Sequence, residues 1–345
     1  MSAPWFKPDI GIDLGTATCL VYVKGRGIVV TEPSVVATDA ETGEILFVGH
    51  EAHRLLGKAP AEINVSRPLR DGVISQYGLT LQMLQIYIKR ACGFHIGRPR
   101  VVICIPANIT EVEEMAVRDA ARNAGAGSIH LIEEPVAAAL GAGIDIFDAR
   151  GNMVVDIGGG TTDIAVISLG SVVVSESIKI AGDKFNDAIK DYVRSRYNLL
   201  IGDLTAEEIK TKIGNVSRRQ DKRTMRVKGR CLAQGIPREI VLRSGEMLEA
   251  MLMPIKGIVD AVCEVIERTP PELVSDIING GIVMTGGGAL LQGFDELITE
   301  ITGIRARVAK NPVNCVVLGT GKALDDVNMF TEARVNISGA PGRQY

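Results

Sequence analysis

With 345 residues, the chain exceeds what one hydrophobic core normally serves, which predicts two domains, and its formal net charge of −3 gives no sign of nucleic-acid binding. Its six cysteines form no Cys-x-x-Cys pair or metal-ligand spacing and are expected to be reduced thiols in a cytoplasm. No apolar run reaches the roughly 20 residues that a membrane-spanning helix needs, and the N-terminus lacks the apolar core of a signal peptide.

The first half of the chain alternates strands and helices, as an α/β protein does. Apolar residues at helical spacing predict a helix over 79–92. Thr110 followed by Glu113 supplies both halves of a capping box, which predicts that a second helix begins there. The other predicted elements are a three-stranded meander over 9–48 that turns at 25–27, buried strands over 101–105 and 129–132, and a helix that opens at Val136.

The same pattern starts again at Met153, so the boundary between two halves is placed at 145–152. The second half carries a polar, charged insertion at 182–248. A strand then ends in the glycine cluster at 286–288, and small residues over 316–324 predict a helix that crosses back to the first half. The composition beyond about residue 332 predicts a loose tail.

Two copies of one phosphate-binding signature occur in the chain, Gly-Ile-Asp-Leu-Gly-Thr-Ala-Thr at 11–18 and Val-Val-Asp-Ile-Gly-Gly-Gly-Thr-Thr-Asp at 154–163. Each predicts a strand, a tight turn whose glycines adopt positive φ, and a second strand. Backbone N–H groups without a neighbouring Cβ approach anions closely, and threonine hydroxyls add donors. Asp13 and Asp156 end the first strands and are oxygen ligands that suit Mg²⁺. One such hairpin is often purely structural, whereas two indicate duplicated halves around one nucleotide.

Five segments together resemble the nucleotide-binding motifs of the actin and heat-shock chaperone superfamily. They are the two hairpins, Ile132-Glu133-Glu134-Pro135, Thr285-Gly286-Gly287-Gly288 and the small-residue helix at 318–324. Within that superfamily the chain resembles the MreB/Mbl family of bacterial actins from Asp9 to about Asn328, with matching stretches at 32–37, 70–74, 151–162 and 269–277. It departs at Thr18, where MreB usually has Asn, and at Asp163, where MreB commonly has Glu and Mbl commonly has Asp. These departures leave nucleotide affinity and the choice of paralogue open.

This resemblance implies an α/β protein with an actin-like ATPase fold. Two duplicated ribonuclease H-like domains, each with a smaller inserted subdomain, are expected to hold the nucleotide in the cleft between them. The implied first half covers 9–146 with an insertion at about 33–74, and the implied second half covers 147–315 with an insertion at about 182–248. A C-terminal helix at 316–330 is expected to return to the first half. The two ends of the chain are expected to be an N-terminal membrane-contacting arm at 1–8 and a flexible tail at 332–345.

The resemblance also assigns a nucleotide site. Gly15, Thr16, Ala17 and Thr18 are expected at the β-phosphate, Gly158, Gly159, Gly160 and Thr161 at the γ-phosphate, Gly286, Gly287, Gly288 and Ala289 beside the nucleoside, and Glu207, Glu208 and Lys210 at the adenosine. Mg²⁺ would bridge the phosphates, with Asp13 and Asp156 holding its waters. Without the resemblance, Glu207 and Lys210 would be an ordinary surface pair at i and i+3.

Glu134 is expected to orient the water that attacks the γ-phosphate, with Thr161 or Thr162 assisting. The alternative is that Glu134 only complements the dipole of the helix that follows it. A small-molecule kinase would need a catalytic aspartate where the chain has Glu134, and a chaperone would need a peptide-binding domain after the ATPase.

The function implied is that of an ATP-dependent, filament-forming cytoskeletal protein, a slow ATPase that directs cell-wall synthesis and rod shape. The choice between ATP and GTP stays open. Its expected location is cytoplasmic and membrane-associated, without nucleic-acid partners. The expected partners are copies of itself in paired protofilaments, the inner face of the cell membrane and membrane proteins of the cell-wall elongation machinery.

Two surfaces are expected to serve assembly. The resemblance implies that the helix at 111–124 joins protofilaments side by side, although its Met115 and Val117 are equally compatible with a place in the core. Trp5 and Phe6 in the N-terminal arm, and Phe94 and Ile96 in a glycine-flanked loop, are apolar side chains beside cations and predict an interfacial membrane anchor. The alternative is that the loop folds back onto the 79–92 helix and the arm packs on the meander.

Overall fold

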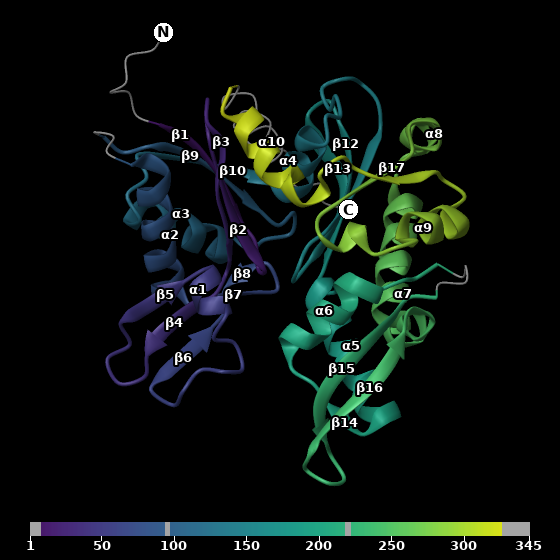
Figure 1. Ribbon diagram of the computed structural model, residues 1–345. Helices are drawn as coiled ribbons and strands as arrows, with labels where there is room; N and C mark the ends of the chain where they lie inside the picture. Colours follow the sequence, from purple (N-terminus) through teal and green to yellow (C-terminus); the bar gives the residue numbers. More distant parts are fainter. Residues whose placement is uncertain (1–7, 94–96, 218–221, 326–345) are drawn as a thin grey trace, which may run out of the picture.

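The computed structural model describes residues 8–93, 97–217 and 222–325, and it contains two halves of similar construction side by side (Figure 1). Each half is built on a five-stranded sheet, with the order β10-β9-β1-β2-β3 in the first and β13-β12-β11-β17-β18 in the second. In both sheets the first three strands in sequence pair antiparallel, and the other two lie parallel to the first. The topology therefore repeats, as the two hairpins predicted.

The strands have the following bounds. The first sheet contains β1 Asp9–Leu14, β2 Thr18–Val23, β3 Gly27–Pro33, β9 Arg100–Ile105 and β10 Ser128–Glu133, and the second contains β11 Asn152–Ile157, β12 Thr162–Ser168, β13 Ser171–Ile178, β17 Ile282–Thr285 and β18 Ala306–Val308. The short strands β7 Leu69–Arg70 and β8 Val73–Ile74 pair with each other. The predicted strands at 101–105 and 129–132 are confirmed. The predicted three-stranded meander is present over residues 9–33, but its predicted end at 48 is wrong, because the strands within 36–48 belong to a separate small sheet.

Two smaller subdomains lie below the large sheets in Figure 1. The one in the first half contains the sheet β5-β4-β6 (β4 Val36–Asp39, β5 Ile45–Val48, β6 Ile63–Ser66) and α1 His50–His53. The one in the second half contains the sheet β14-β15-β16 (β14 Leu199–Leu200, β15 Thr224–Cys231, β16 Pro237–Arg243) beside α5 Gly182–Tyr197 and α6 Asp203–Ile213. The remaining helices are α2 Tyr77–Cys92, α3 Glu111–Asn123, α4 Glu134–Gly141, α7 Ser244–Arg268, α8 Pro271–Gly280, α9 Phe294–Thr302 and α10 Cys315–Ala323, with short 3₁₀ helices η1 Gly288–Leu290 and η2 Pro312–Asn314.

The start of α3 shows how local sequence determines an element. The Thr110 hydroxyl accepts a hydrogen bond from the Glu113 N–H at 3.3 Å, and the Glu113 carboxylate accepts one from the Thr110 N–H at 2.9 Å. This reciprocal pair is the predicted capping box, and it satisfies N–H groups that have no partner within the helix. The helix predicted over 79–92 is also confirmed as α2, which begins two residues earlier.

A core of apolar residues joins the two halves. It contains Ala137, Ala138 and Ala139 of α4, together with apolar residues of β9, β11, β12 and α10. Figure 1 shows α4 and α10 crossing between the two large sheets. Because both helices carry small side chains at the crossing, their backbones approach closely.

Two glycines allow that close approach. A Cβ added to Gly141 would lie 1.7 Å from the Cys315 carbonyl oxygen, and one added to Gly319 would lie 1.8 Å from the Ala137 carbonyl oxygen. The Lys322 ammonium of α10 also donates a hydrogen bond to the Leu140 carbonyl at 2.7 Å. The helix that follows the second half is thus attached firmly to the first.

The structure contains no disulfide among the six cysteines, all of which lie in its described residues. Among the described residues, no helix combines the length and the apolar character needed to cross a membrane. The predicted N-terminal arm, except Pro8, and the predicted tail lie outside the described residues.

Candidate functional site

A cleft of about 450 Å³ lies between the two halves. Most of the residues that the sequence analysis assigned to nucleotide binding and hydrolysis line it. They are Asp13, Gly15, Thr16, Ala17, Thr18, Glu134, Asp156, Gly158, Gly159, Gly160, Thr161, Glu207, Lys210, Gly286, Gly287 and Gly288. The fold therefore brings segments from both halves into one site.

The two glycine turns meet within the cleft. A Cβ added to Gly159 would lie 2.5 Å from the Cβ of Ala17, and one added to Gly160 would lie 2.6 Å from the Thr16 hydroxyl oxygen. Neither glycine has a positive φ, so the prediction that these turns depend on left-handed glycines is wrong. Glycine is required here because the two turns approach each other closely, which suits loops that hold one phosphate chain from both sides.

Asp13 and Asp156 occupy corresponding positions in β1 and β11. Burial raises the pKa of each carboxyl group to about 7, because an apolar surrounding disfavours the charged form. Hydrogen bonds oppose this shift: the Thr285 hydroxyl donates to Asp156 at 2.6 Å, and the Cys104 thiol donates to Asp13 at 3.5 Å. A cation between these groups would favour their charged forms.

The donor set fits a magnesium ion held through its waters. Within 8–93, 97–217 and 222–325, no three His, Cys, Asp or Glu side chains are placed to hold a metal ion by themselves. Mg²⁺ usually keeps several waters and takes its remaining ligands from one or two carboxylates and from substrate phosphates. Asp13 and Asp156 match that requirement.

Glu134 opens α4 and faces the cleft. Its pKa lies well above the usual range, first because of burial and second because of the negative charge of Asp163. Asp163, on β12, is fully buried; one of its carboxyl oxygens accepts a hydrogen bond from the Ala107 N–H at 3.4 Å, and the other has no partner among the described residues. Buried carboxyl groups with a raised pKa that face a cleft are candidates for proton transfer, and Glu134 is one such group.

Three predicted residues do not line the cleft. Thr162 is buried, and its hydroxyl donates to the Ile180 carbonyl at 2.7 Å. Glu208 is exposed and pairs with a lysine of its own helix at 2.6 Å, and Ala289 is buried within η1. Of the two threonines expected to assist hydrolysis, only Thr161 faces the cleft.

Glu207 and Lys210 form an ion pair at 2.7 Å on α6. The Lys210 ammonium also donates to the Gly182 carbonyl at 3.0 Å, and the Asn186 amide donates to Glu207 at 2.8 Å. Both partners belong to α5, so the pair is anchored to a neighbouring helix. This makes it more than the ordinary surface pair that spacing alone suggested.

The cleft also contains residues that the sequence analysis missed. His53 of α1 and Arg67, which follows β6, come from the small subdomain of the first half, and Asp183 comes from the start of α5. The Arg67 guanidinium donates to the Asp183 carboxylate at 3.0 Å across the cleft. No sequence motif links these positions, because only the folded chain brings them together.

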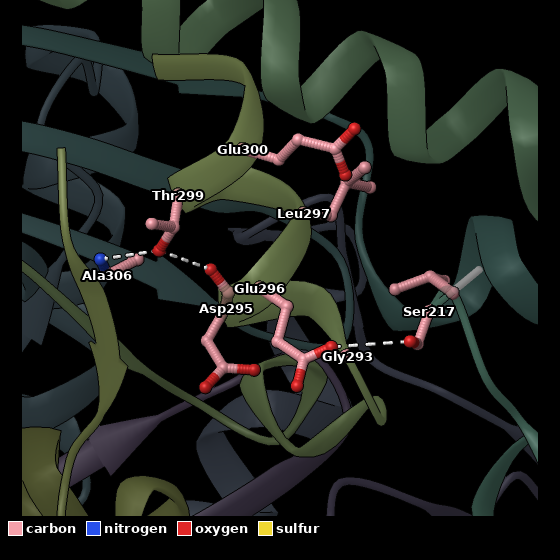
Figure 2. Close-up of a pocket in the computed structure, with 9 residues that line it drawn as sticks. Ser217, Gly293, Asp295, Glu296, Leu297, Thr299, Glu300 and Ala306 are labelled. Atoms are coloured by element: carbon pink, nitrogen blue, oxygen red, sulfur yellow. Dashed lines mark hydrogen bonds between the residues drawn. The ribbon is translucent and has the colours of Figure 1, made fainter. Parts of the chain in front are cut away.

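A second cavity, of about 540 Å³, lies beside α9 on the second half (Figure 2). Its lining residues are Val216, Ser217, Gly293, Asp295, Glu296, Leu297, Thr299, Glu300 and Ala306. The Thr299 hydroxyl accepts from the Ala306 N–H and donates to the Asp295 carbonyl, and the Ser217 hydroxyl donates to Glu296. Its lining has three carboxylates and no cation, which disfavours an anionic ligand. The lining of the cleft, by contrast, includes the cations Arg67 and Lys210.

The helix expected to join protofilaments, α3, presents two large apolar side chains to solvent. Val112 is 77% exposed and Met115 is 62% exposed, whereas Val117 is 7% exposed and packs in the core. The alternative that Met115 and Val117 are core residues therefore holds for Val117 alone. The proposed membrane residues Trp5, Phe6, Phe94 and Ile96 lie outside the described residues.

The sequence matches the family model described as "MreB/Mbl protein" over residues 7–332. It is 48% identical to the cell shape-determining protein Mbl of Bacillus subtilis over 96% of this chain and 100% of that protein. It is 50% identical to the cell shape-determining protein MreB of Escherichia coli over 94% of this chain and 95% of that protein. Because the two identities are so close, they do not decide between the paralogues.

Solved structures show the same arrangement. MreB5 of Spiroplasma citri bound to AMPPNP superposes with a TM-score of 0.90 at 38% sequence identity, over 95% of this chain and 99% of that one. A MamK double helical filament gives a TM-score of 0.80 at 20% identity, over 93% of this chain and 99% of that one, and at this identity it supports the fold alone.

Proposed function

The chain belongs to the MreB/Mbl family of bacterial actins, and from that membership we propose that it binds ATP in the cleft and hydrolyses it slowly, in step with assembly into filaments. The predicted actin-like ATPase fold is confirmed, and the function is that of a cytoskeletal protein that determines cell shape. The main support for the nucleotide site is the contact between the two glycine turns, which line the cleft together with Asp13 and Asp156.

Donors on the two glycine turns support ATP as the ligand of the cleft. Thr16 and Gly160 lie within contact distance where the two turns meet, so a phosphate chain bound alongside both turns would meet backbone and hydroxyl donors from both halves. MreB5 of Spiroplasma citri has been solved with AMPPNP and with ADP, which supports an adenine nucleotide in the same cleft here. The anchored pair Glu207 and Lys210 is the proposed contact for adenosine.

Hydrolysis requires a water molecule in line with the γ-phosphate. We assign its positioning to Glu134, whose side chain faces the cleft beside Thr161 and the buried Asp163. In its charged form Glu134 can accept the proton that the water loses, and burial, which raises its pKa, makes that carboxylate a stronger base than an exposed one. When bound, Mg²⁺ would neutralise charge on the phosphates, with Asp13 and Asp156 holding its waters.

We also propose the domain division at 9–146 and 147–315, with small subdomains at about 33–74 and 182–248. The repeated sheet topology supports it, since β1–β10 and β11–β18 each provide one complete five-stranded sheet. The position of α10 against α4 supports the return of the C-terminal helix to the first half.

Filament assembly is proposed to involve two kinds of contact. Subunits stack head to tail, a heterologous contact that does not close on itself and therefore extends without limit. Protofilaments then pair through α3, whose exposed Val112 and Met115 would be costly to leave in water. The paired filament is proposed to direct cell-wall synthesis together with membrane proteins of the elongation machinery.

Sedimentation and electron microscopy test this function. We expect the wild-type protein to sediment with Mg²⁺ and ATP as paired filaments and to remain in the supernatant with ADP.

Replacing both Val112 and Met115 by Glu should yield single filaments or none, because charges would face each other across the pairing surface. Val173→Glu, at an exposed apolar residue of β13, is the matched control and should leave pairing intact. Paired filaments of the α3 variant would rule out this surface.

The inner membrane surface is the second proposed partner. Trp5, Phe6, Phe94 and Ile96 are expected to insert their side chains among lipid headgroups, and a filament that repeats them gains avidity. Polymer of the wild type should therefore float with anionic liposomes, whereas a variant with Ser at all four positions should not float but should still hydrolyse ATP. Equal flotation of this variant would exclude the anchor, and polymer without liposomes controls for density.

A further inference from the structure

A segment of the first half reaches across the cleft to the second. Arg67 follows β6 in the small subdomain, and its guanidinium donates to the Asp183 carboxylate at 3.0 Å. About a third of each side chain stays exposed, with 30% for Arg67 and 36% for Asp183. Both residues line the cleft, so this ion pair lies beside the path by which a nucleotide would enter or leave the proposed site.

The acidic partner is attached to the second phosphate turn. The Asp183 N–H donates to the Gly159 carbonyl at 2.8 Å, and the Gly182 N–H donates to the Gly158 carbonyl at 3.1 Å. Any displacement of the turn that holds the γ-phosphate is therefore transmitted to Asp183. The ion pair with Arg67 extends this connection to the small subdomain of the first half.

The same segment contacts both phosphate turns a few residues later. The Gly72 N–H donates to the Thr16 hydroxyl at 2.9 Å, and a Cβ at Gly72 would lie 2.9 Å from the Thr161 methyl carbon. Residues 67–72 thus form a strap that contacts the first turn through Gly72, and the second turn through Gly72 and through the Arg67–Asp183 pair. Opening the cleft would break the contacts with Thr161 and Asp183 together, whereas the contact with Thr16, in the same half, would remain.

Further charges strengthen the attraction between the two sides. Burial raises the pKa of the Glu207 carboxyl group, but its neighbours lower this pKa overall, Lys210 with a larger effect and Arg67 with a smaller one. The first half therefore contributes cationic Arg67 at the cleft, and the second half contributes the carboxylates of Asp183 and Glu207. Opposite charges on facing walls favour the closed cleft.

We infer that Arg67 and Asp183 form a clamp that holds the cleft closed over a bound nucleotide and slows its release. This inference rests on the proposed nucleotide site. Arg67 is a positioning residue that acts through Asp183 and the second phosphate turn. Because the clamp joins two protein side chains and does not depend on a contact with the γ-phosphate, it slows the release of ATP and of ADP equally.

The test reverses the charge of each partner separately and then exchanges the two charges in a double variant. The protein is loaded with fluorescent ATP or ADP, below the concentration at which it sediments, and release is followed in stopped flow after excess unlabelled nucleotide is added. Arg67→Asp and Asp183→Arg should each release both nucleotides about five-fold faster, the effect of a partly exposed ion pair of about 1 kcal/mol. The double variant R67D/D183R should restore release to within about two-fold of the wild type, by the logic of a double-mutant cycle.

Controls come from the same elements. Arg54→Asp on the small subdomain and Asp191→Arg on α5 change the same charges at exposed positions outside the cleft lining, and both should release nucleotide at the wild-type rate. Unchanged release from both single reversals would overturn the clamp, as would a swap that fails to restore the rate. Acceleration for ATP alone would also overturn it, because that result indicates a direct phosphate contact. A wild-type protein that binds no nucleotide would instead refute the proposed function.

Discussion

Glu134→Gln is expected to lower ATP hydrolysis by about two orders of magnitude or more while ATP binding stays close to that of the wild type. The amide keeps the shape of the side chain but cannot accept the proton of the attacking water. The substitution therefore raises the free energy of the transition state for hydrolysis and leaves that of bound ATP largely unchanged. Single-turnover phosphate release and equilibrium nucleotide binding measure the two quantities separately.

Filaments of this variant should persist longer, since the nucleotide state that favours assembly decays more slowly. Glu41→Gln, at an exposed position in the small subdomain, is the control and should hydrolyse ATP normally. Phosphate release at the wild-type rate from the Glu134 variant would remove Glu134 from the mechanism. Loss of binding together with hydrolysis would instead show that the carboxylate holds the ligand itself.

Gly319→Ala is expected to destabilise the whole protein, because its new Cβ would lie 1.8 Å from the backbone oxygen of Ala137 where α10 crosses α4. A backbone atom cannot rotate away as a side chain can, so the helices must separate. Overpacking of this kind costs roughly 1–3 kcal/mol, which corresponds to about 2–4 °C of melting temperature per kcal/mol in a domain of 150–250 residues. Thermal unfolding followed by circular dichroism measures the change.

Gly245→Ala in α7 is the matched control for this substitution. A Cβ at Gly245 would meet nothing within 4 Å, and its φ is not positive, so alanine should leave stability unchanged or raise it by up to about 1 kcal/mol. If the two variants melt at the same temperature, the crossing of α4 and α10 tolerates separation and does not hold the halves together.

Local sequence was sufficient to predict most of the architecture. The hairpins at 11–18 and 154–163 combine apolar strands with a glycine turn, and the Thr110 and Glu113 capping box uses only residues three apart. Such patterns act over a few residues and therefore leave a signal in the sequence. The repeated topology of the two sheets follows from the repetition of these patterns.

The differences between the predicted site and the lining of the cleft have a geometric origin. Thr162 is the first residue of β12 and Thr161 directly precedes it; the side chain of Thr161 reaches the cleft, whereas that of Thr162 is buried. Glu207 and Glu208 are neighbours on α6 and diverge by the helical rotation between adjacent residues. A motif identifies such a pair of residues, whereas the direction of each side chain depends on the register of the element.

The ion pair of Arg67 and Asp183 left no signal in the sequence at all. Its partners belong to different halves, and each reads as an ordinary polar residue near the end of an element. The glycines of the phosphate turns were recognised for the wrong reason, since they permit contact between two turns and have no positive φ. Interactions between halves depend on how the halves pack, which no local pattern encodes.

The buried carboxyl group of Asp156 links ligand binding in the cleft to the stability of the subunit. Asp156 lines the cleft and is 5% exposed, and without a cation its charge adds an unfavourable term to the folded state. A ligand that binds only the folded protein adds stability as its concentration rises above its dissociation constant. With the cleft binding Mg²⁺ and nucleotide as proposed, an empty subunit is the form most often unfolded and most exposed to proteases. Proteolysis would then remove empty subunits before loaded ones.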